Sequence, residues 1–350
     1  MDKSPRKYIF RIGGKLKTLI LNALTQREYA IAKSAEILLA GGLVAIPTET
    51  VYGLGANAFD ERAVSNIFAA KGRPADNPLI VHVNTVEMAE EVAHVTAEAK
   101  ILCEKFWPGP LTLVLKSKRI LPEIISAGQD TLAVRMPAGD IIREIIDRAG
   151  VPLAAPSANV SGRPSPTTAA HVLADLSGKI DAVADGGPCA VGIESTVVDM
   201  TGIPTILRPG AVTAGDIGGF FPDVRVADTL PKDDGKILSP GMKYCHYAPK
   251  TKLTAVISAD EEFYNFINNL GNNTLAVCYD EDVANLRVPY VSLGPGENYA
   301  AQANRLFAAL REIDEIAPNE AYIRMPDRCG IGAALYNRLT KACSGRIVEL

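Results

Sequence analysis

The sequence predicts an α/β protein of two domains, and three observations support this prediction. Short apolar segments that end at a glycine, a proline or a polar residue alternate with longer segments that are apolar at every third or fourth position, which are the patterns of buried strands and amphipathic helices. A chain of 350 residues is long for one hydrophobic core. The periodicity also fades from about residue 211 to residue 250 and then resumes. We therefore expect a mixed twisted sheet with flanking helices, a long linker and a smaller αβα domain.

Glycine, proline and capping residues mark the elements of the first domain in order. A helical pattern stops at Gly41 and Gly42, and the apolar segment 43–47 after it indicates a buried strand. Asp60 is a suitable N-cap for the next helix, which should end at Gly72. Further strands are expected at 79–83, 111–115, 132–136, 151–155, 195–200 and 204–208, and further helices at about 87–105, 140–149 and 167–176. Because several strands follow each other after only a turn, the sheet should be mixed rather than purely parallel.

The domain boundaries are predicted from composition. Residues 1–17 carry six Lys or Arg without the apolar core of a signal peptide, and we expect them to form a disordered extension. The first domain should span 18–215, the linker 216–250 and the second domain 251–350. The linker is rich in Gly, Asp, Pro and Lys and is long for a compact protein, which indicates a role of its own. In the second domain the segments KLTAVIS, NTLAVCY and AYIRM indicate strands, and NYAAQANRLFAALREID indicates a helix.

The composition restricts the class of protein. The formal net charge is −4, which argues against a protein coated in basic charge for nucleic-acid binding and leaves room only for a local basic cleft. The six cysteines include no C-x-x-C pair, so we expect reduced thiols rather than a zinc site or a disulfide framework. No uncharged apolar run is long enough for a membrane span. We therefore expect a cytoplasmic protein that does not bind membranes.

Polar and glycine-rich clusters follow the predicted strands. In open α/β sheets ligands bind outside the strand ends, and hydroxyls and backbone N–H groups there suit phosphate oxygens. Arg73, Arg135 and Arg208 can each donate two parallel hydrogen bonds to a phosphate or a carboxylate. The clusters are PTETVYGLGANA (47–58), KGRPADNP (71–78), LAVRMP (132–137) with Thr131 before it, APSANVSGRPSPTT (155–168), and GIESTVVD (192–199) followed by LRPG (207–210).

The motifs that are absent indicate the kind of chemistry. The sequence has no GxxxxGK[ST] phosphate loop, no GxSxG and no H-E-x-x-H. A site built from donors, without a nucleophile and its base, suits a reaction between groups that the substrates bring, with positioning and charge stabilisation supplying the rate.

Each cluster also has a structural explanation when it is taken alone. Lys71 and Arg73 would complement a helix C-terminus, Ser157 and Asn159 would shape a turn before the next helix, and His82 would be a core histidine. The occurrence of five such clusters at strand ends favours a common site.

The ordered motifs resemble the longer, two-domain form of L-threonylcarbamoyladenylate synthase. They are PTETVYGLGANA, KGRPADNPLIVHV, FWPGPLT, LAVRMP, PSAN-x-SG-x-PSPT, ESTVVD, LRPG and SPGMKY-x-HYAP. The resemblance covers about residues 18 to 350 and implies a YrdC-like first domain and a Rossmann-like second domain. It implies a nucleotidyltransferase that makes L-threonylcarbamoyl-AMP from L-threonine, bicarbonate and ATP with Mg²⁺, and releases pyrophosphate. The product would pass to the tRNA threonylcarbamoyl-transfer machinery, which modifies the adenosine beside the anticodon.

The resemblance also implies which residues form the site. L-Threonine would be held by Thr50, His82, Arg135, Ala155 and Ser195. ATP would be held by Arg73, Asn77, Thr131, Ser157, Ser165, Arg208 and Tyr247. Lys71 and Arg73 would be catalytic, near the phosphates, and no residue is expected to bind a metal directly. The linker would fold back over the nucleotide through Tyr247 as a lid that excludes water, with His246 beside it.

Two other functions are weighed against this one. The first is a non-catalytic RNA-binding module, which the acidic balance and the lack of interleaved aromatic and basic residues disfavour; the basic N-terminal arm leaves room for a weak RNA contact. The second is carbamoyl transfer of the kind found in hydrogenase-maturation proteins. Those proteins carry cysteine runs and an acylphosphatase segment that this sequence does not have.

Overall fold

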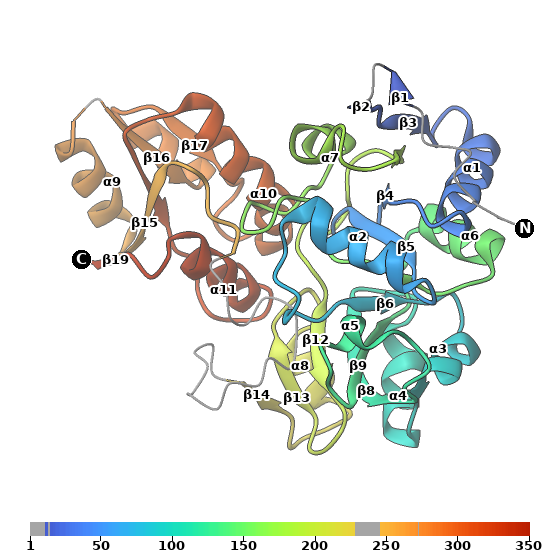
Figure 1. Ribbon diagram of the computed structural model, residues 1–350. Helices are drawn as coiled ribbons and strands as arrows, with labels where there is room; N and C mark the ends of the chain where they lie inside the picture. The colour runs from blue at the N-terminus through green and yellow to red at the C-terminus, as the bar shows by residue number, and fades with distance from the viewer. Residues whose placement is uncertain (1–10, 13–14, 228–245, 272) are drawn as a thin grey trace, which may run out of the picture.

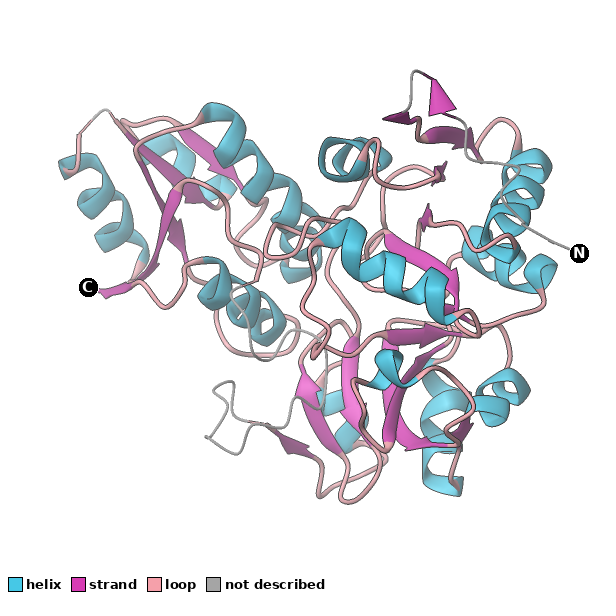
Figure 2. Cartoon of the chain, in the orientation of Figure 1, coloured by secondary structure: helices cyan, strands magenta, loops and turns pink. Residues whose placement is uncertain are grey.

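The computed structural model describes residues 11–12, 15–227, 246–271 and 273–350, and it shows two α/β units joined by the linker (Figures 1 and 2). The expected fold class is confirmed, because a large mixed sheet is followed by a smaller sheet with its own helices. Most of the predicted extension 1–17 and most of the linker 216–250 lie outside the described residues. Within the described part of the chain, no helix has the length and apolar character needed to cross a membrane.

The larger sheet has twelve strands in the order β14-β13-β12-β8-β9-β6-β10-β5-β4-β11-β3, with β7 paired to β8. It is mixed, as expected: β6 and β9 are parallel, whereas β8 and β9 are antiparallel. The strands are β3 (Leu19–Asn22), β4 (Val44–Ile46), β5 (Gly53–Asn57), β6 (Ile80–His82), β7 (Ala93–His94), β8 (Leu111–Ser117), β9 (Thr131–Arg135), β10 (Leu153–Ala154), β11 (Ala182–Asp185), β12 (Thr196–Asp199), β13 (Thr205–Arg208) and β14 (Arg225–Val226).

The helices of this unit are α1 (Arg27–Leu39), α2 (Glu61–Lys71), α3 (Val86–Val92), α4 (Ala97–Phe106), α5 (Glu123–Ser126), α6 (Asp140–Ala149), α7 (Ala169–Leu176) and α8 (Ala214–Gly218). The prediction for α2 is confirmed at both ends. The Asp60 side chain accepts hydrogen bonds from the backbone N–H groups of Arg62 and Ala63, and Gly72 ends the helix in the left-handed conformation that glycine adopts without strain. These two caps place Lys71 and Arg73 at the C-terminal end of the helix.

Four local predictions differ from the structure. The segment 53–57, expected within a polar and glycine-rich cluster after a strand, is itself strand β5, where small residues let neighbouring backbone approach closely. The single helix expected at 87–105 is divided into α3 and α4, because β7 between them pairs with β8. The larger sheet also continues to β14, beyond residue 215. The described part of 1–17 includes an antiparallel ribbon of β1 (Arg11–Ile12) and β2 (Lys15–Leu16) rather than an unstructured arm.

The smaller unit is built on a five-stranded sheet of order β17-β16-β18-β15-β19, in which every pair is parallel. Its elements are β15 (Lys252–Ile257), α9 (Asp260–Asn269), β16 (Thr274–Cys278), the 3₁₀ helix η1 (Asp280–Asn285), β17 (Tyr290–Ser292), α10 (Tyr299–Ile316), β18 (Glu320–Arg324), α11 (Gly332–Ala342) and β19 (Ile347–Glu349). The helices α10 and α11 lie on the side that faces the larger unit (Figure 1). The apolar core of the smaller unit extends to Val51, Ile193 and Tyr247, so the two units share buried contacts.

The turn after β13 is packed against the start of β12, and this contact yields a prediction. A methyl group on Gly210 would collide with the backbone nitrogen of Thr196 and would lie 2.8 Å from the carbonyl carbon of Ser195. We expect Gly210→Ala to lower the free energy of unfolding by about 1–3 kcal/mol, as overpacking usually does. Urea denaturation is the measurement. The matched control is Gly202→Ala, where no atom lies within 4 Å of the added methyl group; an equal loss in both variants would contradict the prediction.

Candidate active site

A polar cavity opens where several strands and loops of the larger unit end beneath the end of the linker. Its lining includes many of the residues that the sequence predicted, namely Thr50, Arg73, His82, Arg135, Ala155, Ser157, Ser165, Ser195, Arg208 and Tyr247. The lining also includes residues that were not predicted to bind a substrate, among them Thr48, Arg163 and Glu194. The strand-end clusters therefore converge on one site, as expected for an α/β sheet.

One wall of the cavity is built on the neighbouring strands β6 and β9, where His82 and Arg135 are register partners. The buried Arg135 guanidinium donates to Thr50 Oγ1 at 2.9 Å and to the Gly109 carbonyl oxygen at 3.2 Å. It also forms an ion pair with Glu49 at 2.6 Å. Glu49 balances a charge that would otherwise be costly to bury.

His82 is held neutral in this wall. Burial, with a contribution from the charge of Arg135, lowers the pKa of His82 from 6.5 to about 3. Its Nδ1 atom is buried and has no hydrogen-bond partner among the described residues. Buried polar atoms are normally paired, so this atom is a candidate contact for a ligand in the cavity.

Another part of the lining is organised around Glu194. One carboxylate oxygen accepts a hydrogen bond from the Ser165 hydroxyl at 2.6 Å, and the other accepts from Arg338 Nε at 3.2 Å. Burial opposes ionisation of Glu194, but the charges of Arg338 and Arg208 outweigh it and hold the pKa of this carboxyl below its ordinary value. Arg208 in turn donates to the backbone oxygen of Ser195 at 3.0 Å and to its hydroxyl at 3.1 Å. Glu194 is therefore an anion that accepts hydrogen bonds from both the Ser165 hydroxyl and the Arg338 guanidinium.

Three of the predicted residues do not line the cavity: Lys71, Asn77 and Thr131. The Lys71 ammonium lies beneath the loop 155–168 and donates to the carbonyl oxygens of Ser157 and Asn159, the latter at 2.6 Å. Burial, together with the charge of Arg73, lowers the pKa of Lys71 well below its ordinary value. In this arrangement Lys71 contacts the loop and does not line the cavity. Arg73 does line the cavity, and it donates to the carbonyl oxygens of Asn77 at 3.2 Å and Pro78 at 2.8 Å.

The end of the linker covers the cavity. Tyr247 is buried, and its ring lies 5.2 Å from the ring of Phe307 in α10 and 5.6 Å from the ring of His246. The backbone N–H of Ala248 donates to the carbonyl oxygen of Gly162 at 3.0 Å, which fixes this segment to the loop 155–168. Tyr247 and His246 are thus placed over the site.

Comparison with known proteins places the chain in a family. A family model described as telomere recombination matches residues 36–210, and a model described as the C-terminal domain of threonylcarbamoyl-AMP synthase matches residues 212–344. The chain is 41% identical over 347 residues to the threonylcarbamoyl-AMP synthase of Pyrococcus abyssi, which covers 95% of this chain and 100% of that protein. It is 40% identical over 337 residues to the corresponding enzyme of Bacillus subtilis, covering 94% and 97%. The crystal structure of P. abyssi Sua5 complexed with L-threonine superposes with a TM-score of 0.88 at 41% identity, covering 95% and 100%.

The chain belongs to the threonylcarbamoyl-AMP synthase family. Membership confirms the expected two-domain form and the expected enzyme class, a transferase that serves threonylcarbamoyladenosine synthesis in tRNA. It does not support the alternative of a non-catalytic RNA-binding module.

Sequence reasoning missed the charged partners of the predicted residues in this family member. Glu49 and Glu194 lie inside the motifs PTET and GIESTVVD, but the sequence gives no sign that each pairs with a buried arginine. Arg163 lies inside the serine-rich motif but was not predicted to bind a substrate, and it lines the cavity. Arg338 is far away in the sequence, in the second domain, where no motif marked it.

The depressed pKa of His82 predicts how stability depends on pH. The unfolded chain takes up a proton below about pH 6.5, whereas folded His82 stays neutral down to about pH 3, so acidification between these values favours the unfolded state. His82 alone should cost about 2 kcal/mol of unfolding free energy between pH 7 and pH 5. When the pH is lowered from 7 to 5, the free energy of unfolding of His82→Gln should therefore fall by about 2 kcal/mol less than that of the wild type. Urea denaturation at both pH values is the measurement. The control is His94→Gln, because His94 is exposed. If the stability of His82→Gln depended on pH as that of the wild type does, His82 would not be the buried neutral group described above.

Proposed function

We propose that this chain makes L-threonylcarbamoyl-AMP from L-threonine, bicarbonate and ATP. The threonine amine forms a bond to the bicarbonate carbon with loss of water, and an oxygen of the new carboxylate attacks the α-phosphorus of ATP while pyrophosphate leaves. The observation that carries the proposal is a donor-built cavity, lined by the neutral His82 and the cations Arg73, Arg135 and Arg208, in a chain that matches known synthases along their whole length. Such a reaction needs orientation and charge stabilisation, and no protein nucleophile.

The proposed L-threonine site is the wall formed by β6 and β9 together with Ser195. Thr50, Ser195 and the backbone at Ala155 supply polar contacts, and the unpartnered Nδ1 of His82 is the proposed contact for a polar group of the amino acid. Arg135 is the proposed partner of the threonine carboxylate. Because this guanidinium already pairs with Glu49, the substrate carboxylate would share it with that residue.

The remaining part of the lining is the proposed ATP site. Arg73 and Arg208 supply positive charge for the phosphates, Ser157 and Ser165 supply hydroxyls, and Tyr247 covers the nucleotide. Asn77 and Thr131, which are not among the lining residues, would reach ATP after a small rearrangement or through water. We propose that Arg73 stabilises the charge that develops at phosphorus. The contacts of Lys71 favour a contribution through the loop 155–168 over direct contact with the phosphates.

Magnesium is proposed to arrive with ATP. The described residues include no group of three or more His, Cys, Asp or Glu side chains that could hold a metal ion. The donor set of the cavity fits a triphosphate whose remaining oxygens bind Mg²⁺, which would neutralise charge on the departing pyrophosphate. The product adenylate would then pass to the tRNA threonylcarbamoyl-transfer machinery in the cytoplasm, with no more than a weak contact between this chain and RNA.

The direct test is pyrophosphate release by the full chain with ATP, Mg²⁺, L-threonine and bicarbonate, in which each component is left out in turn. We expect release only when L-threonine and bicarbonate are both present. Release that ignores threonine would reject the proposed reaction.

The proposed role of Arg135 gives a kinetic prediction. Removing a donor that holds the substrate carboxylate should lower kcat/KM for L-threonine by about 10²–10³-fold in Arg135→Ala. The control is Arg148→Ala, whose guanidinium is half exposed and pairs with Glu28 on the surface. Initial rates of pyrophosphate release give both values. Unchanged kinetics in Arg135→Ala would remove this residue from the proposed site.

The proposed lid gives a second kinetic prediction. Tyr247→Ala removes the ring that packs against Phe307, so water should reach the hydrolysis-prone adenylate and the yield of threonylcarbamoyl-AMP per ATP consumed should fall about tenfold. Tyr247→Phe keeps the ring and should retain most of the yield. The yield is measured by chromatography of the nucleotide products. Equal yields from Tyr247→Ala and Tyr247→Phe would contradict the proposed role of Tyr247 as a lid.

A further inference from the structure

The smaller unit contacts the loop that carries two of the proposed ATP ligands. This loop, residues 155–168, joins β10 to α7 and contains Ser157 and Ser165. Two buried arginines of the smaller unit are involved: Arg311 of α10 contacts this loop directly, and Arg338 of α11 contacts Glu194, the partner of Ser165.

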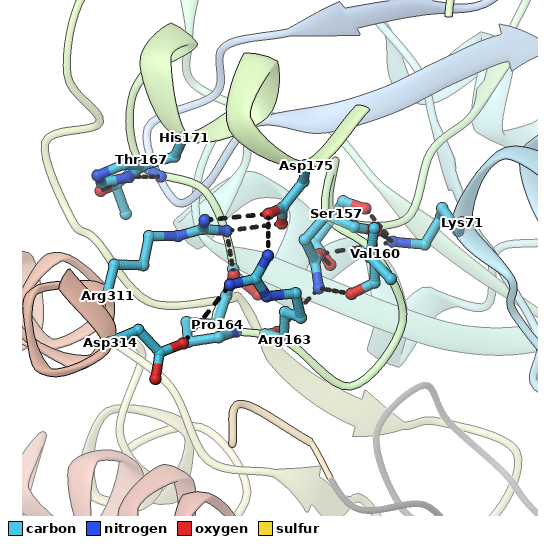
Figure 3. A network of polar contacts seen from close by, with 12 residues as sticks. Lys71, Ser157, Val160, Arg163, Pro164, Thr167, His171, Asp175, Arg311 and Asp314 are labelled. Atoms are coloured by element: carbon cyan, nitrogen blue, oxygen red, sulfur yellow. Dashed lines mark hydrogen bonds and ion pairs between the residues drawn. The ribbon is translucent and has the colours of Figure 1, made fainter. Parts of the chain in front are cut away.

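Arg311 holds the loop from one side. Its guanidinium forms an ion pair with Asp175 at 2.9 Å and donates to the carbonyl oxygen of Pro164 at 2.6 Å, as Figure 3 shows. The carboxylate of Asp175 is fully buried and also accepts from Arg163 at 3.1 Å. Arg163 lines the cavity, so Asp175 links a guanidinium of the smaller unit to a guanidinium of the site. The carbonyl that Arg311 binds belongs to the residue immediately before Ser165.

Arg338 acts on Ser165 through Glu194. Its side chain is fully buried; Nε donates to the Glu194 carboxylate at 3.2 Å, Nη2 donates to the Glu194 backbone oxygen at 3.3 Å, and Nη1 donates to the carbonyl oxygen of Pro209. The same carboxylate accepts the Ser165 hydroxyl at 2.6 Å. The hydroxyl of Ser165 and the peptide before it are therefore both fixed by arginines from the smaller unit.

The end of the linker shares this anchor. Asp314, one helical turn after Arg311, accepts hydrogen bonds from the backbone N–H groups of Lys250 at 2.6 Å and Thr251 at 3.1 Å. Its other oxygen lies 3.5 Å from Arg163 (Figure 3). The helix α10 thus connects the serine loop to the segment that carries Tyr247.

An interface that only joined two domains would gain little from these arginines, because a buried ion pair is seldom more stabilising than apolar packing of the same volume. Its hydrogen bonds do have fixed directions, which apolar contacts lack. We propose that the smaller unit is a brace for the active-site loop, and that Arg311 and Arg338 are positioning residues that set the orientation of Ser165 toward ATP. This inference rests on the proposed function for its substrate and on the contacts above for its geometry.

The test compares Arg311→Gln and Arg338→Gln with Arg324→Gln in the full chain. Arg324 is also a buried arginine of the smaller unit, but its carboxylate partners, Asp260 and Asp282, belong to that unit. The control therefore removes a buried ion pair without touching the serine loop. In the two brace variants we expect the KM for ATP to rise about tenfold, the size of one lost charge-assisted hydrogen bond, while the KM for L-threonine changes less than about twofold. Arg324→Gln should leave both constants within about twofold of the wild type.

Hydrogen exchange supplies a readout that does not depend on the reaction. Amides in peptides covering 156–168 should exchange faster in the brace variants than in the wild type and Arg324→Gln. Where a glutamine variant does not fold, Arg311→Lys or Arg338→Lys keeps the charge but loses the forked geometry, and should give the same change in smaller measure. An unchanged KM for ATP with unchanged loop exchange, or equal effects in Arg324→Gln, would overturn the brace. If the wild type itself releases no pyrophosphate, the proposed function fails, and loop exchange alone decides the brace.

Discussion

The buried carboxylate of Glu194 is the constraint on which the rest of the site depends. A buried anion without partners is costly, so it must be met by hydrogen bonds and positive charge. Its partners come from separate parts of the fold: the Ser165 hydroxyl from the loop before α7, and the Arg338 guanidinium from α11. Satisfying this one group brings the serine loop, the start of β12 and the smaller unit together in one arrangement.

The same principle explains the wall formed by β6 and β9. Arg135 is buried because Glu49, Thr50 and the Gly109 carbonyl accept its hydrogen bonds. The fixed cation beside His82 then helps burial to keep that imidazole neutral. The result is a cavity in which cationic donors and a neutral hydrogen-bonding group are already ordered before a substrate enters. Little reorganisation is then needed when negative charge develops during the reaction.

Much of the fold could be predicted from the sequence because local signals are strong where they act through the chain itself. The Asp60 and Gly72 caps predict the ends of α2, and the apolar segment 43–47 predicts β4, within a residue or two. Strand β5 was missed because its glycines resemble a turn, whereas they serve the close packing of neighbouring backbone. The break between α3 and α4 was missed because it depends on the pairing of β7 with β8, which no local pattern contains.

The sequence by itself determined the alternation of strands and helices and the set of donors at the strand ends, since both follow from periodicity and turn chemistry over a few neighbouring residues. The strand-end clusters contain Thr50 and Arg208, and the family resemblance added His82; all three line the cavity. Only the tertiary structure decided that Lys71 lies beneath the serine loop and that Glu194 pairs with an arginine 144 residues away. The physical reason is that the partner of a buried charge is chosen by which groups the folded chain brings within hydrogen-bond distance.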